Sequence, residues 1–205
     1  MDKTATQDKL VNAFFELYRE TPIEEINIKA ITDLAGYHRS TFYEYFTDIY
    51  DLLKKEEDQI IHQMETSVIE PITSGKLNPL STASMLSPIA GLYETNGEKI
   101  AVLIGSNGDP MFRERMAGCM KEGLKFALKA MPSGYQVDCL IEFLSSGMLS
   151  VVNKAYADRN MEIADLISLV HTTVSQMVAG FMKHSDAPDG NCGTANFSAP
   201  DRADA

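Results

Sequence analysis

Apolar residues recur every three or four positions along most of this chain, which is the spacing of one buried face on an α-helix. The first such stripe holds Leu10, Phe14, Leu17 and Tyr18. Further helices are predicted near residues 27–36, 39–46, 49–70, 81–95, 97–105, 109–131, 137–158 and 162–184. No segment alternates apolar and polar residues as a strand would. The pattern therefore predicts an all-α fold.

Short polar residues and glycine mark where several of these helices begin and end. Asn27 and Asp48 are natural N-caps, and Asp109 is a third, with Pro110 at the first helical position. Gly36 is expected to end the helix that begins after Asn27. Pro71 is expected to close the helix that begins after Asp48. Inside the 27–36 helix the inward-facing residues are expected to be Ile28, Ile31 and Leu34.

The segment 27–46 predicts two short helices joined by a glycine turn, which is the helix-turn-helix pattern. Phe42 and Phe46 stand four apart, so both are expected on the core side of the second helix. Arg39 and the polar residues around it are left for the surface, where an arginine can bond guanine bidentately. A helical hairpin with ordinary surface aromatics explains the same residues, and composition alone leaves both interpretations open.

The stretch INIKAITDLAGYHRSTFYEYFTDIYDLL, with LVNAFFELYRE before it, resembles the N-terminal DNA-binding domain of TetR/AcrR-type transcriptional regulators over residues 8–55. The matching pattern is the Ala35-Gly36 turn, the polar run 38–40, and Thr41-Phe42-Tyr43 followed by Tyr45-Phe46. The resemblance implies a DNA-binding surface. Its expected members are Asn27, Lys29, Tyr37, His38, Arg39, Ser40, Thr41, Tyr43 and Tyr45.

The charge of this segment departs from what a DNA-binding domain usually carries. The chain has a net charge of -11, and residues 1–50 hold five Lys and Arg against nine Asp and Glu. The family usually has a phosphate-binding lysine at the start of its fourth helix, where this chain has Ile49. Because phosphate contacts supply much of the affinity for DNA, the salt dependence is expected to be shallow. A protein-binding co-regulator with a weakened DNA-binding head stays open as the alternative.

The remainder of the chain carries no recognisable catalytic motif. HExxH, GxSxG and glycine-rich phosphate loops are absent, and the three cysteines form no pair spaced for zinc. We therefore expect neither an enzyme nor a metal or other cofactor. No apolar run approaches the roughly 18 residues of a membrane span, which predicts a cytoplasmic protein that does not bind membranes.

The two C-terminal helices are expected to pair with a second copy of the chain. The 137–158 helix is apolar on nearly every side, so we expect burial on every side, part of it beneath a partner. The resemblance implies a four-helix bundle between two copies, and a purely intramolecular bundle is the alternative. The expected interface residues are Leu144, Met148, Val151, Val170, Val174, Met177 and Phe181.

A ligand pocket is expected in the same body, because the chain holds eleven methionines and no tryptophan. Methionine suits adaptable apolar pockets, although it also fills ordinary cores. The expected pocket residues are Met64, Met85, Phe112, Met116 and Met120.

Three segments follow from these observations. Residues 1–48 are expected to bind DNA, residues 49–184 to bind an effector and dimerise, and residues 185–205 to form a disordered tail, because they hold too few apolar residues to fold. The expected function is a homodimeric repressor that binds a near-palindromic operator in double-stranded DNA and is released by a small-molecule effector. An activator of the same family is a second possibility.

Overall fold

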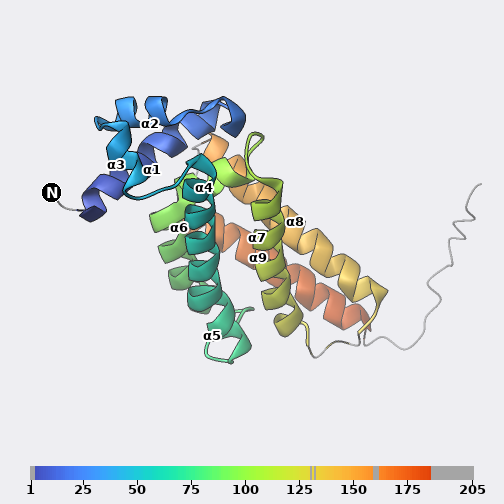
Figure 1. Cartoon of the computed structure of the whole chain (residues 1–205). Coiled ribbons are helices and arrows are strands. Elements are labelled where there is room, and N and C mark those ends of the chain that lie inside the picture. The colour runs from blue at the N-terminus through green and yellow to red at the C-terminus, as the bar shows by residue number, and fades with distance from the viewer. Residues whose placement is uncertain (1–2, 130, 132, 159–161, 186–205) are drawn as a thin grey trace, which may run out of the picture.

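The computed structural model describes residues 3–129, 131, 133–158 and 162–185, and this part of the chain is all helical, as predicted. The element order is α1 (Lys3–Glu20), η1 (Ile23–Glu25), α2 (Ile28–Ala35), α3 (Arg39–Tyr43), α4 (Ile49–Met64), η2 (Glu65–Ile69), α5 (Glu70–Thr73), α6 (Thr82–Ile104), α7 (Pro110–Ala127), α8 (Tyr135–Asp158) and α9 (Ile163–Ser185). In Figure 1 the blue helices α1–α3, here called the head, gather at one end of the long helices α4 and α6–α9, here called the body. The tail expected from residue 185 onward lies, apart from Ser185, outside the described residues.

The three predicted N-caps are confirmed by their hydrogen bonds. The side chain of Asn27 accepts a bond from the amide of Ala30 at 3.0 Å. Asp48 accepts from the amide of the third residue beyond it at 2.8 Å, and Asp109 accepts from the second beyond it, also at 2.8 Å. Gly36 ends α2 in the left-handed region with φ 76°, which a residue without a Cβ adopts at little cost. These helix ends are set by local chemistry.

Two helix boundaries differ from the prediction. Helix α6 runs unbroken through residues 96–97, where two helices were expected. The side chain of Asn96 is buried, and its Nδ2 atom donates to the Oε1 atom of Gln63 at 2.7 Å. This polar residue is therefore satisfied inside the helix bundle. The segment after α4 also continues past Pro71, which lies in the first turn of α5, and ends near Gly75 with φ 77°.

The inward-facing residues of α2 also differ in part. Leu34 is 47% exposed, whereas Ile31 and Thr32 are buried. At about 100° per residue, the buried face centres between Ile31 and Thr32, and Leu34 falls about 110° away from that centre. The hydroxyl of Thr32 donates to the carbonyl of Ile28 at 2.9 Å, which lets a polar side chain occupy the inner face.

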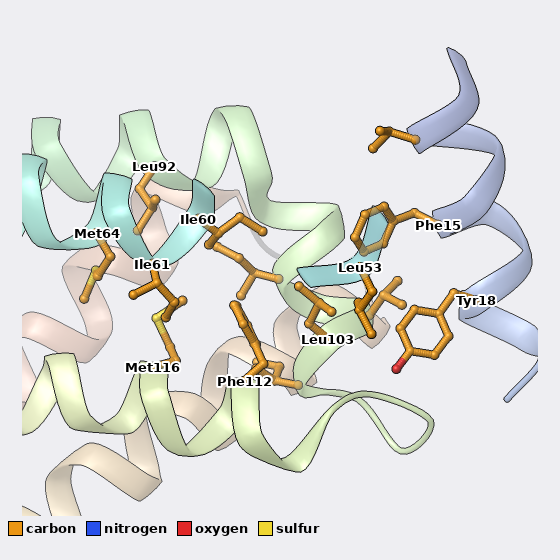
Figure 2. Close-up of a cluster of buried hydrophobic side chains, with 14 of the residues drawn as sticks. Phe15, Tyr18, Leu53, Ile60, Ile61, Met64, Leu92, Leu103, Phe112 and Met116 are labelled. Carbon is orange, nitrogen blue, oxygen red and sulfur yellow. The ribbon is translucent and has the colours of Figure 1, made fainter. Parts of the chain in front are cut away.

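One hydrophobic core runs from the head into the body. In Figure 2 the aromatic rings of Phe15 and Tyr18 on α1 lie across from Leu53 on α4 and Leu103 on α6. The same cluster continues along α4 to Met64. A smaller second cluster joins α7, α8 and α9. The head and the body therefore share one continuous core. No helix in the described residues is both long and apolar enough to cross a membrane.

Candidate DNA-binding surface and effector cavity

The helix-turn-helix places α3 through its aromatic inner face. Phe42 and Phe46 are fully buried, and their rings pack at a centroid distance of 5.4 Å. The turn that precedes α3 is held by a bond from the amide of Tyr37 to the carbonyl of Thr32 at 2.8 Å. Because the inner side is fixed in this way, the opposite side of α3 is presented to solvent in one orientation.

The exposed side of α3 carries most of the predicted DNA-contact residues. Tyr43 is 58% exposed, His38, Arg39 and Ser40 are also exposed, and Thr41 is half-buried. Lys29 is exposed on the neighbouring helix α2. Within the described part of the chain, no ion pair engages the cations of Lys29 and Arg39. Two unpaired cations and several hydroxyls therefore face solvent around the N-terminal end of α3.

The other three predicted contact residues, Tyr37, Tyr45 and Asn27, each have partners within the head. The hydroxyl of Tyr37 lies 3.5 Å from the Oγ1 atom of Thr6, and the ammonium of Lys9 lies 5.9 Å from the centre of its ring. Tyr45 is half-buried against the core. Asn27 uses its side-chain oxygen as the α2 cap, so its amide nitrogen is the group that could reach a phosphate. Tyr37 and Tyr45 therefore help to hold the head together.

Lys55 is a cation near α3 that the sequence analysis did not select. The side chain of Ile49, where the family has its lysine, is half-buried against the core. Six residues further along α4, the Nζ atom of Lys55 donates to the carbonyl of Tyr45 at 3.1 Å and to the Oδ2 atom of Asp51 at 2.9 Å. It also lies 5.3 Å above the ring of Phe46. The signal in the sequence was the Asp51–Lys55 spacing of four, which places both side chains on one helix face.

An apolar cavity of about 120 Å³ lies in the body, walled by the segment from the end of α4 to α5 and by α6, α7, α8 and α9. Of the five residues predicted for a ligand pocket, Met64, Met85 and Met120 line it. Phe112 and Met116 are not in its wall; both are fully buried in the packed core. Helical periodicity could show that these five are buried, but it could not show which of them border a void.

Exposed apolar side chains on α8 and α9 form what we call the α8–α9 face, defined by Phe143, Val151, Leu169 and Met177. Phe143 is 63% exposed, so one side of α8 is left uncovered within one chain. The other predicted interface residues are buried or half-buried and do not belong to this face. Leu144 belongs to the second core cluster, Phe181 is half-buried, and the cavity is lined by Met148, Val170 and Val174.

Charged residues join the head to the body at the α1–α4–α6 junction. Arg19 on α1 pairs with Glu98 on α6 at 3.3 Å, with both side chains largely exposed. Glu56 on α4 is buried and accepts from Lys99 on α6 at 2.7 Å. The adjacent Glu57 is equally buried, but its Oε1 atom has no hydrogen-bond partner in the described residues.

The carboxyl of Glu57 has an unusual proton affinity. Burial, with the Asp109 carboxyl beside it, raises the pKa of Glu57 to about 7. Asp58 also raises this pKa, and the guanidinium of Arg115 lowers it. Burial, together with the carboxyls of Asp109, Glu57 and Glu24, raises the pKa of the Tyr18 hydroxyl to about 12, so this group stays neutral at physiological pH. The junction therefore holds one group that titrates near neutrality.

Several solved structures share this fold. The dihydroxyacetone kinase operon activator DhaS matches with a TM-score of 0.52 and 14% identity, over 87% of this chain and 97% of that one. A TetR transcriptional regulator from Streptococcus agalactiae 2603V matches with a TM-score of 0.53 and 23% identity, over 84% of this chain and 94% of that one. A protein described as a TetR-family regulator, from Syntrophomonas wolfei str. Goettingen, matches with a TM-score of 0.61 and 15% identity, over 86% and 96% of the two chains.

The fold of this chain is therefore the all-α fold of TetR-type regulators. No family model matches the sequence. No curated protein matches it either.

Proposed function

We propose that this chain is a TetR-family transcriptional regulator that acts in the cytoplasm without catalysing a reaction. Residues 1–48 form its DNA-binding unit, and residues 49–184 form its effector-binding and dimerisation unit. As a homodimer it binds a near-palindromic operator and represses transcription, and a small molecule bound in the body releases it. The observation that carries the proposal is the solvent-facing side of α3, where Tyr43 is 58% exposed and Arg39 has no ion pair among the described residues.

The DNA-binding role is supported by the rigid placement of α3. Recognition helices of helix-turn-helix proteins place their N-terminal residues against base edges in the major groove. Here that end begins with Arg39, Ser40 and Thr41, and the buried pair Phe42 and Phe46 fixes the helix beneath them. An arginine that is not engaged in an internal ion pair can donate to guanine without first breaking a contact.

Dimerisation is supported by the α8–α9 face. The exposed Phe143 and Val151 are eight positions apart on α8, and Leu169 and Met177 are eight apart on α9, so each pair lies along one side of its helix. Small exposed residues, Gly147 among them, lie between the members of the α8 pair and permit a close helix approach. Exposed apolar side chains gathered on two neighbouring helices are typical of a protein–protein interface.

The direction of regulation is a separate part of the proposal. DhaS, whose fold is similar, is described as an operon activator. That observation favours activation as the second candidate, because the same DNA contacts serve either outcome and the operator position decides between them. A protein-binding co-regulator remains a third candidate, favoured by the head's excess of acidic residues and by Ile49 at the expected lysine position.

A gel-shift assay with DNA from upstream of the chain's own gene tests the DNA-binding role. Arg39→Ala is expected to weaken specific binding by about 1–3 kcal/mol, the cost of one bidentate base contact. Lys125→Ala removes the same charge from an exposed site on α7 and is expected to leave binding unchanged. If both variants bind as the wild type does, α3 is not the reading helix. If no shifted protein–DNA complex forms even at low salt, and a protein partner co-purifies with the chain, the co-regulator interpretation replaces the DNA-binding one.

A further inference from the structure

We propose that the body cavity binds an uncharged, almost wholly apolar molecule of about the size of one six-membered ring. This inference deepens the proposed function, because the bound molecule would be the effector. The binding event itself does not require DNA. Three observations support it: the volume of the cavity, the chemistry of its wall, and a glycine in the C-terminal half of α7.

The volume of the cavity limits the ligand to a small molecule. The void holds about 120 Å³. An engineered protein cavity of about 150 Å³ with a similarly apolar wall stays dry and binds benzene. Four methionines, Met64, Met85, Met120 and Met148, line the void here. Their flexible thioethers can move to admit a ring that slightly exceeds the empty volume.

The wall of the cavity excludes a charged ligand. Among the described residues that line it, none is Asp, Glu, Lys or Arg. His171 is one of the few polar residues in the wall, and its ring nitrogens are engaged. The Nε2 atom lies 2.9 Å from the carbonyl oxygen of Pro79, to which it must donate, and the Nδ1 atom lies 3.4 Å from the Oγ atom of Ser175. A buried charge without a partner is strongly unfavourable, so the cavity favours a neutral molecule.

Gly123 on α7 leaves part of this volume open. Neither a turn nor a crowded contact requires glycine there, because an added Cβ would meet the Cδ1 atoms of Ile69 and Ile72 at 3.5 and 3.6 Å, which is ordinary contact. Glycine inside a helix is nevertheless less stable than alanine. A side chain at this position would occupy the cavity. Gly118 on the same helix has open space around it and does not line the cavity, so it provides a matched control.

Methionine-methyl NMR on the full-length chain tests the proposal with benzene as the probe. Benzene is expected to shift the methyl signals of Met64, Met85 and Met120, but not those of the exposed Met111 and Met177. Titration calorimetry is expected to give one site per chain. Benzoate and benzylammonium, which have the same ring with a charge attached, are expected to bind at least a hundredfold more weakly because their charge would be buried.

Glycine variants assign the site. Gly123→Leu is expected to weaken benzene binding at least tenfold, whereas Gly118→Leu binds as the wild type does. Gly123→Ala serves if the leucine variant does not fold, and it is expected to bind benzene more weakly while melting at a higher temperature. The proposal is overturned if benzene leaves the three cavity signals unshifted, if benzoate binds as well as benzene, or if both Gly123 variants bind normally.

The proposed function and this inference fail separately. NMR and calorimetry contain no DNA, so a chain that binds benzene but no operator retains the cavity assignment and loses the regulatory role. A chain that binds its operator but not benzene retains the regulatory role and loses the cavity assignment.

Discussion

Two adjacent glutamates on α4 should respond in opposite ways to the same substitution. Glu56 and Glu57 are each 5% exposed, at the end of the body that meets the head. Glu56 accepts a charge-assisted hydrogen bond from Lys99 at 2.7 Å. One oxygen of Glu57 has no partner in the described residues, and after burial the Asp109 carboxyl is the largest cause that raises the pKa of Glu57. Replacing each glutamate by glutamine keeps its shape and removes its charge.

The magnitude for Glu57 follows from its pKa, which burial and Asp109 raise from the ordinary 4.5 to about 7. Because the folded state holds the proton more tightly than the unfolded chain, the stability due to Glu57 is fully present below pH 4.5. It is lost as the pH rises through 7. At 1.36 kcal/mol per pKa unit, the loss across this window is about 3 kcal/mol.

Glu57→Gln should therefore raise the free energy of unfolding by about 3 kcal/mol at pH 8 and by less than about 1 kcal/mol at pH 5. Glu56→Gln should lower it, by roughly 1–3 kcal/mol, because the ammonium of Lys99 loses its charged acceptor. Urea unfolding followed by circular dichroism between pH 5 and 8.5 measures both effects. Tyr18 does not contribute in this window, because its pKa is raised to about 12.

A Glu57→Gln variant whose stability follows the wild-type pH profile at a constant offset would refute the reasoning. That outcome means that the Glu57 carboxyl has its ordinary pKa in the folded chain. A variant less stable than the wild type at pH 8 also contradicts it, because the carboxylate would then be stabilised by Arg115 rather than destabilised by Asp109 and Asp58.

Three further predictions concern the head and the dimer. The logarithm of the operator association constant should fall with the logarithm of the salt concentration with a slope of only about -4 to -5, because each of the two heads in a dimer has two or three available cations. A slope near about -10 would contradict the charge argument. Phe143→Glu should convert a dimer to a monomer in analytical ultracentrifugation, whereas Met111→Glu, at an equally exposed methionine on α7, should not. Asp48→Ala should cost about 1 kcal/mol of stability in urea unfolding because α4 loses its cap, and Asp48→Asn should restore most of it.

Features set by near neighbours in the sequence were the predictable part of this fold. The caps at Asn27, Asp48 and Asp109 each need only a side chain and an amide two or three residues away, and all three are present. The glycine turn at Gly36 and the buried faces of Phe42 and Phe46 are local in the same sense. Helix propensity and periodicity therefore sufficed for the all-α fold and for the geometry of the helix-turn-helix.

Features that depend on distant neighbours were missed. Asn96 looked like a helix boundary because its partner, Gln63, lies on another helix. The burial of Glu56 and Glu57 has no local signal either, since no local pattern shows that Lys99 will cover one of them and Asp109 will approach the other. The cavity wall depends in the same way on how five segments pack, and periodicity carries no information about that packing.

The wide turn η2 has a consequence for the length of the chain. The amide of Glu70 bonds to the carbonyl of Glu65, five residues back instead of four, so this segment holds one residue more than a continuous α-helix would. Deleting one residue here would let α4 run smoothly into α5. Because the wide turn already takes up the extra residue within a single turn, the direction in which Ile72 faces the cavity would change little. A relative that is one residue shorter at this point should therefore keep that wall, together with the ligand preference that it supports.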